Sequence, residues 1–252
     1  MKAKDIWWIT GASSGIGRAL ALRMAQAGMR VVVSARSKAA LDTLSNENEN
    51  IIPYPVDVSD SQQVATAIKW IESSVGQIHG AVLNAGIYEP MLSNDYNHEV
   101  LARTFDINVL GVSRALDQLI PVMLNRNCGH IVIMASLAGW RGLPNAVAYG
   151  ASKAAVTYMA ETLRLELFSS GIKVQVIHPG FVDTPATKVN TFKMPFLMTV
   201  EQAADQIMAG LKRNSFTISF PRRFALIFRV LRLLPDHLYF TLTRRSTRSR
   251  RS

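Results

Sequence analysis

The sequence predicts an α/β fold in which a doubly wound parallel sheet of about seven strands is flanked by helices. Short apolar runs alternate along the chain with longer amphipathic segments, a pattern typical of parallel strands joined by helices. The 252 residues contain no internal repeat or low-complexity linker before the C-terminal end, and α/β chains of this length commonly form one domain. We therefore expect one domain over residues 1–220 and a basic amphipathic extension over residues 221–252.

Seven apolar runs are the predicted strands. They cover, in chain order, residues 5–10, 30–35, 51–57, 80–86, 130–136, 173–180 and 215–220. The segments between them predict helices over residues 15–28, 61–76, 103–124 and 148–171. Two helix starts have the spacing of a capping box, and these are Ser59 with Gln62 and Thr199 with Gln202.

The excess positive charge lies entirely in the C-terminal end. Residues 1–211 hold 17 basic and 17 acidic residues, whereas residues 212–252 hold 11 basic residues and one acid, Asp236. A nucleic-acid enzyme would carry basic residues around its main cleft, so this distribution favours an added surface or tether. The single cysteine, Cys128, excludes an intrachain disulfide and a cysteine-cluster metal site. The start lacks a signal-peptide pattern, and the expected location is cytoplasmic.

A glycine-rich stretch, ITGASSGIG, follows the first predicted strand and opens the first predicted helix. Gly11, Gly15 and Gly17 stand where a backbone must turn tightly and approach a pyrophosphate, and the exposed amides of the helix start would favour an anion. A turn of this kind can also form without any ligand. The order of strand, turn and helix favours a nucleotide site.

The stretch AYGASKAAV places Tyr149 and Lys153 four residues apart, so both side chains leave the same face of a helix. Taken alone, the pair is an ordinary helix face with a tyrosine at its edge. A phenol has a pKa of about 10 and is a sluggish acid or base at neutral pH unless a nearby positive charge stabilises the phenolate. Lys153 is placed to supply that charge.

Further motifs follow in order along the chain. An N-A-G turn at residues 84–86 ends the fourth predicted strand, Ser136 ends the fifth, and HPGFVDT at residues 178–184 ends the sixth. With T-G-x-x-x-G-x-G at residues 10–17 and Y-x-x-x-K at residues 149–153, the chain resembles a short-chain dehydrogenase/reductase of the compact, single-domain subfamily. The resemblance covers nearly everything before the extension. It implies a Rossmann-like fold and a nicotinamide-dependent oxidoreductase.

The resemblance implies four catalytic residues. Tyr149 would pass a proton to or from the substrate oxygen, Ser136 would hydrogen-bond that oxygen, and Lys153 would also hold the nicotinamide ribose. Asn108 matches the fourth catalytic position and would hold a water that links Lys153 to solvent. The alternative is a strand-end serine, a helix asparagine and an edge tyrosine. One departure is Leu83, where many members have another Asn, but the N-A-G turn is intact.

The end of the second predicted strand favours NADP(H) over NAD(H). Enzymes that use NAD normally place Asp or Glu there for the ribose 2′-hydroxyl, whereas this turn has Ala35 and then Arg36. Arg36 would pair with the 2′-phosphate, with Ser34 or Ser37 donating beside it. The alternative is a solvated turn arginine.

Other cofactor contacts are implied by position in the family. Besides Arg36, Tyr149 and Lys153, they are Gly11, Ser13, Ser14, Gly15, Ile16, Gly17, Asp57, Val58, Asn84, Ala85, Gly86, Pro179, Gly180, Phe181 and Thr184. Asp57 could instead cap the following helix, although Ser59 is better placed for that role. His178 is interpreted as a structural residue, and no metal-ligand spacing is present.

The substrate is expected to be an apolar carbonyl or alcohol. In the resembled family, the segments after the P-G motif and after the catalytic serine complete the pocket. An apolar wall would be formed by Leu137, Trp140, Met194, Phe196, Leu197 and Met198. These residues could equally pack a lid onto the core.

The extension predicts an amphipathic helix. Arg222, Arg229 and Arg232 share one side, and the other side is apolar, with Phe224, Ile227, Phe228, Leu231 and Leu234. The longest apolar run, residues 224–228, is too short to cross a bilayer. The helix could lie on an anionic membrane, aided by the basic run 244–252, or it could dock on its own domain or on a second subunit.

Two other functions compete with the enzyme. A non-catalytic dinucleotide-binding scaffold or sensor would have no chemical need for Ser136, Tyr149 and Lys153 together. Nucleic-acid binding through the basic run would be nonspecific, because that run has no interleaved aromatic residues. Relatives often form dimers or tetramers, so a homodimer or homotetramer is expected.

Overall fold

The computed structural model describes the backbone of residues 1–248 and the side chains of residues 1–243. Its centre is a parallel sheet in the order β3-β2-β1-β4-β5-β6-β7, which confirms the predicted α/β class. The strands are β1 (Ile6–Thr10), β2 (Arg30–Ser34), β3 (Ile51–Pro53), β4 (Ile78–Leu83), β5 (Gly129–Met134), β6 (Ile172–Pro179) and β7 (Thr217–Phe220). The strand order reverses between β1 and β4, and ligands bind beyond the carboxyl ends of the strands at such a point.

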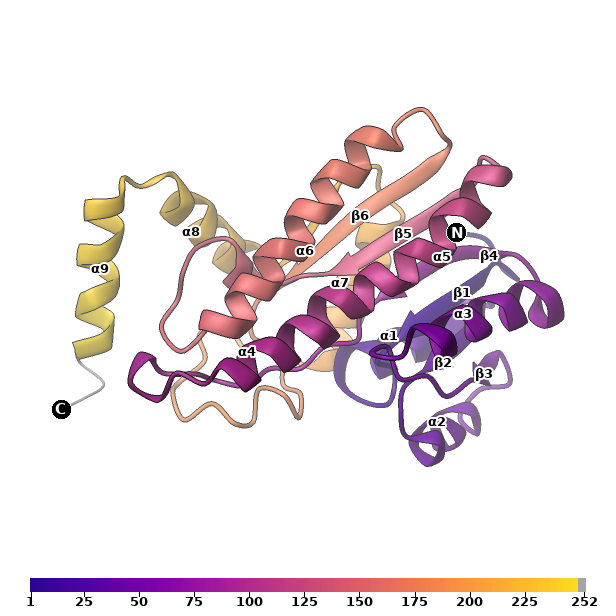
Figure 1. Cartoon of the computed structure of the whole chain (residues 1–252), viewed down its shortest axis with the longest axis horizontal. Coiled ribbons are helices and arrows are strands. Elements are labelled where there is room, and N and C mark those ends of the chain that lie inside the picture. Colours follow the sequence, from indigo (N-terminus) through magenta and orange to yellow (C-terminus); the bar gives the residue numbers. More distant parts are fainter. Residues whose placement is uncertain (249–252) are drawn as a thin grey trace.

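Helices cover both faces of the sheet (Figure 1). They are α1 (Gly15–Gln26), α2 (Lys38–Ser45), α3 (Ser61–Trp70), α4 (His98–Phe105), α5 (Gly111–Asn125), α6 (Val147–Glu166), α7 (Val200–Leu211), α8 (Arg222–Leu233) and α9 (Asp236–Arg248). Consecutive side chains of a strand point to opposite faces, so Trp8 packs in the core with α3, α5 and α6, while Trp7 packs in the core with α1, α2 and α7. This double burial explains why the strands are continuous apolar runs.

One predicted helix cap is wrong. The carboxylate of Asp60, not the hydroxyl of Ser59, caps α3 by accepting hydrogen bonds from the backbone amides of Gln62 at 2.9 Å and Gln63 at 3.1 Å. Ser59 instead donates its amide and hydroxyl to Asp57, because the helix begins one residue later than the capping-box spacing predicts. The capping box of Thr199 at the start of α7 is confirmed.

The predicted helix 103–124 is part of a longer helical stretch, His98–Asn125, formed by α4, a π-helical segment (Asp106–Leu110) and α5. By length and composition alone this stretch could cross a membrane. Its apolar side chains, including Val112, Leu116 and Leu119, lie in the core with α3, α6 and the sheet. Packing within the domain therefore accounts for its composition.

For the first helix of the extension, the alternative of docking on its own domain is confirmed. Phe224, Ala225 and Phe228 of α8 are buried against Leu137, Trp140, Leu143 and Phe181 of the same chain. Hydrophobic burial against the domain therefore holds this apolar side of α8, and it does not face a membrane. The basic run 244–252 lies outside the side chains that the structure describes.

Candidate active site

A cavity of about 730 Å³ lies at the carboxyl ends of the strands. The segments that follow β1, β2, β4, β5 and β6 line it, together with residues of α6 and α8. The predicted catalytic residues and the cofactor contacts implied by the family all line this cavity, except Gly17 and Asn108. The sheet therefore collects into one place motifs that are widely separated in the sequence.

The glycine-rich turn brings the backbone close to the neighbouring loop. Gly11 has φ +67°, and a Cβ there would lie 2.7 Å from the Cα of Ala85. Gly17 does not line the cavity, because it faces the protein: a Cβ would lie 2.5 Å from Nδ2 of Asn84 and from the carbonyl oxygen of Gly11. The first glycine thus permits the turn, and the last permits close packing behind it.

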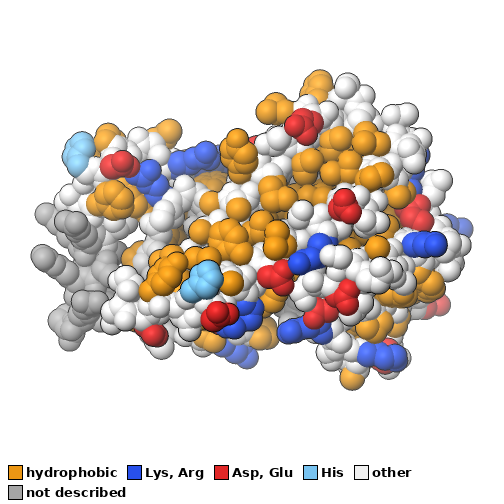
Figure 2. All heavy atoms as spheres, in the orientation of Figure 1, with side chains coloured by type: hydrophobic (Ala, Val, Ile, Leu, Met, Phe, Trp, Pro, Cys, Tyr) orange, Lys and Arg blue, Asp and Glu red, His pale blue; other side chains and the backbone are white. Residues whose placement is uncertain are grey.

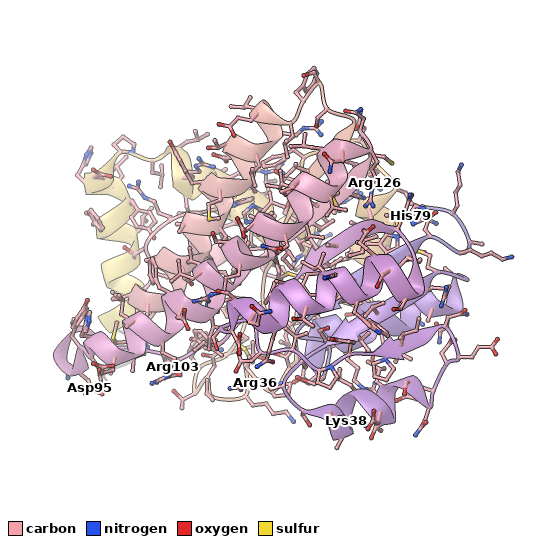
Figure 3. All side chains as sticks on the ribbon, turned by 45° about the vertical axis from the view of Figure 1, so that its right-hand side comes forward. Arg36, Lys38, His79, Asp95, Arg103 and Arg126 are labelled. Carbon is pink, nitrogen blue, oxygen red and sulfur yellow. The ribbon has the colours of Figure 1, made fainter. Side chains whose placement is uncertain are left out.

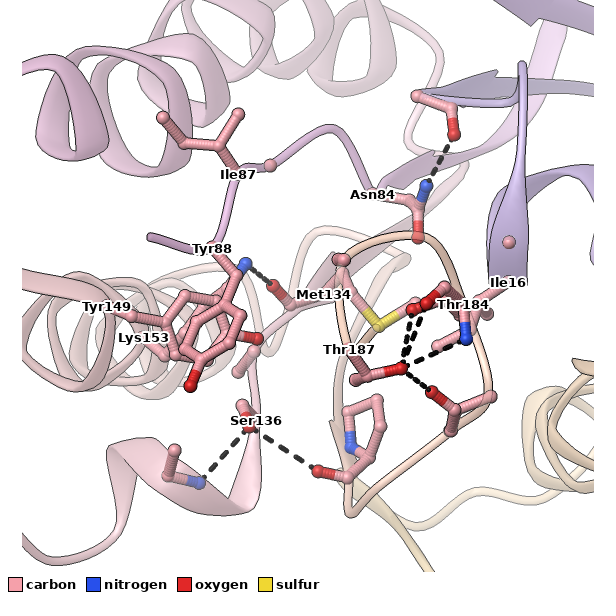
Figure 4. Close-up of a pocket in the computed structure, with 18 of the residues that line it drawn as sticks. Ile16, Asn84, Ile87, Tyr88, Met134, Ser136, Tyr149, Lys153, Thr184 and Thr187 are labelled. Atoms are coloured by element: carbon pink, nitrogen blue, oxygen red, sulfur yellow. Dashed lines mark hydrogen bonds between the residues drawn. The ribbon is translucent and has the colours of Figure 1, made fainter. Parts of the chain in front are cut away.

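Hydrogen bonds lock the glycine-rich turn to the N-A-G turn. Oγ1 of Thr10 accepts from the amides of Asn84 at 3.0 Å and Ala85 at 3.1 Å. In return, Nδ2 of Asn84 donates to the carbonyl oxygens of Thr10 at 2.9 Å and Gly11 at 3.0 Å. Figure 4 shows Asn84 at the edge of the cavity. These bonds fix the two loops in one geometry.

The residues at the start of α1 fit a pyrophosphate. The N-cap residue, Ser14, makes no side-chain capping bond, and the first turn of α1 has no acidic residue. Ser13, Ser14 and Gly15 line the cavity, so the amide-rich, positive end of the helix dipole lies beside it. The loop thus offers both the space and the donors that a dinucleotide needs.

Arg36 lines the cavity at the carboxyl end of β2. Its side chain is exposed, lines the cavity, and forms no salt bridge or side-chain hydrogen bond with the residues that the structure describes (Figure 3). Asp57 lines the same end, and its pKa is lowered mainly by the hydrogen bonds from Ser59, with a smaller contribution from Arg36.

Of the two serines expected beside Arg36, only Ser37 lines the cavity. Its hydroxyl oxygen caps α2 by accepting from the amide of Ala40 at 3.3 Å. The expectation for Ser34 is wrong, because its side chain is buried and accepts a hydrogen bond from Nε1 of Trp8 at 2.9 Å.

Tyr149 and Lys153 of α6 lie beside Ser136, which follows β5 (Figure 4). Nζ of Lys153 donates to the carbonyl oxygen of Met134 at 2.8 Å and lies 5.7 Å from the centroid of the Tyr149 ring. Oγ of Ser136 accepts from the amide of Ala138 at 3.1 Å, donates to the carbonyl oxygen of Pro179 at 3.5 Å and lies beside the Tyr149 hydroxyl. The phenol, the ammonium and the hydroxyl therefore share one wall of the cavity.

Burial sets the protonation of this group. It raises the pKa of Tyr149 to about 12, although the hydrogen bond with Ser136 works in the opposite direction. Burial also lowers the pKa of Lys153 to about 8. The expected stabilisation of phenolate by Lys153 is not seen, because burial dominates the pKa of Tyr149 and Lys153 does not contribute to its shift. At neutral pH the Tyr149 phenol keeps its proton and Lys153 is mostly charged.

Asn108 lies behind the cavity wall and not on it. It is fully buried, with Oδ1 accepting from the amide of Ile87 at 2.8 Å and Nδ2 donating to the carbonyl oxygen of Ile87 and to Oγ of Ser152, both at 3.0 Å. Gly86 separates it from the site: a Cβ there would lie 3.0 Å from Oδ1 of Asn108 and 3.3 Å from Nζ of Lys153. Its side chain thus positions the loop that carries Gly86.

The end of β6 and the segment after it also line the cavity. Pro179, Gly180, Phe181 and Thr184 line the cavity as predicted by position. His178 does not line it. Nδ1 of His178 lies 3.2 Å from the carbonyl oxygen of Ser136, and burial lowers the pKa of His178 to about 4. Among the described residues, no three His, Cys, Asp or Glu side chains gather as a metal site.

The predicted apolar wall is largely wrong. Of its six residues only Leu137 lines the cavity. Phe196 instead packs its ring 5.6 Å from that of Phe224, and Met198 packs against the core. Other residues of the same segment, among them Asn190, Phe192 and Pro195, line the cavity instead. Helix α8 adds to this wall through Phe224, Ile227, Phe228 and Leu231.

Sequence reasoning also missed Tyr88. Its ring meets that of Tyr149 edge to face at 4.9 Å between centroids, and its hydroxyl donates to Oδ1 of Asn190 at 2.9 Å. Figure 4 shows the two rings together. Tyr88 follows the N-A-G turn by two residues, and this position could have indicated it.

Comparisons with known proteins agree with this geometry. The sequence profile of the family described as short chain dehydrogenase matches residues 5–194. An uncharacterized oxidoreductase of Myxococcus xanthus is 35% identical over 241 residues, which cover 94% of this chain and 95% of that protein.

Two solved structures are similar over most of the chain. A short-chain dehydrogenase from Sphingobium yanoikuyae in complex with NADPH has 27% identity and a TM-score of 0.80, covering 90% of this chain and 91% of that one. A short chain dehydrogenase/reductase from Burkholderia phymatum in complex with NAD also has 27% identity and a TM-score of 0.80, covering 90% and 92%. Structures of equal similarity thus carry different nicotinamide cofactors.

Proposed function

The chain belongs to the short-chain dehydrogenase family, and from this premise we propose that it is an NADP(H)-dependent oxidoreductase that interconverts an apolar carbonyl compound and its alcohol. One observation carries the proposal. Ser136, Tyr149 and Lys153 share a single cavity with the glycine-rich turn and with Arg36. A proton donor, a cation and a dinucleotide cradle therefore lie in one enclosed space.

The bound nicotinamide would supply or accept hydride. Ser136 would donate a hydrogen bond to the substrate oxygen and hold the carbonyl in place. Tyr149, whose phenol is protonated at neutral pH, would give its proton to that oxygen as charge develops on it. Lys153, already fixed by the carbonyl oxygen of Met134, would hold the cofactor ribose and place positive charge beside the phenol. A protonated phenol suits reduction of the carbonyl.

Arg36 supports the preference for NADP(H). Ala35 and Arg36 follow β2, so no carboxylate stands there to accept the ribose 2′-hydroxyl. The guanidinium is exposed and unpaired by any described acidic side chain, and it can form two charge-assisted bonds with a phosphate. We propose that Ser37 lies beside that phosphate.

An apolar substrate fits the other end of the cavity. The rings of Phe181 and Phe224 pack 5.7 Å apart there, and Ile227, Phe228 and Leu231 continue the same surface. Such a lining favours hydrocarbon around a single polar group.

Turnover with NADPH tests the proposal. The purified full-length protein would be supplied with NADPH and a series of aliphatic and aromatic aldehydes and ketones, and cofactor oxidation would be followed by absorbance. The Tyr149→Phe variant should lose turnover by about 10²- to 10⁴-fold while keeping its NADPH affinity. Tyr158→Phe is the matched control, because Tyr158 lies on the same helix with its side chain 73% exposed.

Two outcomes would contradict the proposal. Undiminished turnover in Tyr149→Phe would remove this residue from the chemistry. Tight NADPH binding by a folded protein that reduces none of the carbonyls and oxidises none of the alcohols with NADP⁺ would favour the second candidate, a non-catalytic dinucleotide-binding scaffold.

We also propose a cytoplasmic homodimer or homotetramer, in which residues 1–220 form the catalytic domain and residues 221–252 form an extension. Support for assembly comes from large apolar side chains exposed on neighbouring helices, notably Leu124 of α5 and Leu165 and Phe168 at the end of α6. Sedimentation velocity over a range of protein concentrations tests this part. A monomer at all concentrations would contradict it.

A further inference from the structure

The outward face of α8 carries a second apolar stripe. Leu226, Val230 and Leu233 are spaced as i, i+4 and i+7, so they share one face of the helix. Their side chains are 61%, 54% and 84% exposed, whereas Phe224 and Phe228 on the inner face are buried. Helix α8 is therefore apolar on both sides, and docking on the domain covers only the inner one.

Arginines border the outward stripe. At 100° per residue, Arg223 lies on one margin of the stripe, and Arg222 and Arg229 lie on the other. All three are exposed. Long basic side chains beside an exposed apolar stripe can extend to anionic groups while the stripe itself is buried.

Helix α9 extends this surface. Leu238 and Leu242, one turn apart on the same face of α9, are 46% and 51% exposed. The helix is held to the domain by Tyr239, whose hydroxyl donates to the carbonyl oxygen of Gly142. An ion pair of Arg141 with Asp236 at 2.5 Å also holds it.

The two helices lie together at one end of the molecule, where α8 also contacts β7 at the edge of the sheet (Figure 1). Figure 2 shows apolar and basic side chains side by side at this end. We call the five exposed apolar side chains of these faces of α8 and α9 and their bordering arginines the outer face, which comprises Leu226, Val230, Leu233, Leu238, Leu242, Arg222, Arg223 and Arg229.

Charge identifies what covers the outer face. Residues 212–252 hold 11 basic residues and one acid, whereas residues 1–211 hold 17 of each, so a second copy of the chain offers no acidic region of matching size. Nucleic acid would match the arginines but leave the apolar stripe in water. A bilayer that contains anionic lipid satisfies both. We propose that the outer face docks on an anionic membrane surface.

The docked helix also borders the cavity. Ile227 is 45% exposed and lines the cavity, so the cavity reaches the surface along the edge of α8. Leu231 of α8 and Thr243 of α9 line the same end. A substrate dissolved in the bilayer would then enter along apolar side chains. This second step rests on the proposed function, whereas membrane docking does not.

Sedimentation with lipid vesicles tests the docking. The full-length protein would be mixed with vesicles of phosphatidylcholine alone or with one third phosphatidylglycerol, and the bound fraction would be measured at low and high salt. We expect at least tenfold stronger binding to the anionic vesicles and a loss of that difference at high salt. Leu233→Glu should weaken binding about tenfold or more, because one exposed leucine can no longer enter the lipid.

Leu92→Glu is the matched control, because Leu92 is 49% exposed and lies outside the outer face. It should bind the vesicles like the parent protein, and circular dichroism should show that both variants are folded. Equal losses in the two variants, or equal binding to both kinds of vesicle, would overturn the proposal. The proposal would also be overturned if the parent protein did not bind vesicles and Leu233→Glu converted a dimer into a monomer. A second copy of the chain would then cover the outer face.

A separate assay addresses substrate entry. With NADPH, a long-chain aldehyde presented in anionic vesicles should be reduced more slowly by Leu233→Glu than by the parent, while a short water-soluble aldehyde should be reduced at equal rates. Equal rates for the long-chain aldehyde would refute entry from the bilayer. Vesicle binding without turnover of any carbonyl would refute the proposed function and leave docking intact.

Discussion

Replacement of Arg36 by Asp should convert a preference for NADPH into a preference for NADH. The guanidinium is exposed, lines the cavity and has no described salt-bridge partner, so its bonds to a 2′-phosphate would not compete with an existing ion pair. Hydrogen bonds to charged groups contribute about 1.5–3 kcal/mol, which corresponds to a loss of about 10- to 150-fold in NADPH affinity. The new carboxylate would repel the phosphate and could accept a ribose 2′-hydroxyl, so NADH affinity should hold or rise.

Fluorescence titrations with NADPH and NADH at one ionic strength measure both dissociation constants. Lys38→Asp is the matched control: it changes the net charge equally and lies two residues away, but Lys38 does not line the cavity and pairs with Asp42. It should alter the NADPH dissociation constant by less than about threefold, as expected for a screened surface charge. An unchanged ratio of NADPH to NADH affinity in Arg36→Asp would refute the phosphate contact. An equal change in Lys38→Asp would show that the loss of affinity comes from the change in net charge and not from a direct contact of Arg36.

Three further outcomes are expected. Because the pKa of buried His178 is lowered to about 4, only the unfolded chain takes up its proton between pH 6.5 and 4. His178 should therefore contribute a fall of about 1.4 kcal/mol per pH unit in the free energy of unfolding as the pH drops through this window, beside a comparable contribution from His130, whose pKa burial lowers to about 3. Urea unfolding should show a smaller fall in His178→Asn. Phe228→Ala should loosen α8 by about 3 kcal/mol, because Phe228 is buried, and hydrogen exchange should then accelerate in α8 but not in α6. Gly11→Ala should destabilise the protein by about 2 kcal/mol or more and weaken NADPH binding, because φ is +67° and the new Cβ would lie 2.7 Å from the Cα of Ala85. The control is Gly142→Ala, whose Cβ would meet nothing within 4 Å and which should change the free energy of unfolding by less than about 0.5 kcal/mol. Equal effects of the two variants would contradict the steric argument.

At Ser34, Ser37 and Asn108, the sequence predicts a position near the site but does not predict where the side chain points. Ser34 and Ser37 both flank Arg36 in the sequence, yet Ser34 turns into the core to accept from Trp8, and only Ser37 lines the cavity. Asn108 was placed by its motif position near Lys153, but the structure commits its carboxamide to Ile87 and Ser152. Sequence position located these side chains within a few residues of the site, whereas their orientation depended on partners far along the chain.

The sequence by itself determined the sheet, its seven strands and the convergence of the glycine-rich turn with Ser136, Tyr149 and Lys153. It could do so because apolar periodicity marks strands and helices locally, and the carboxyl ends of parallel strands meet at one edge. Only the tertiary structure decided the wall of the substrate end and the outward side of α8. Periodicity shows that a helix has apolar faces but not which one is buried, and in α8, Phe224 and Phe228 face the domain while Leu226, Val230 and Leu233 remain in solvent. The buried face of α8 is the one whose side chains pack closely against Leu137, Trp140 and Phe181. These residues are distant from α8 in the sequence and contact it only after the chain has folded.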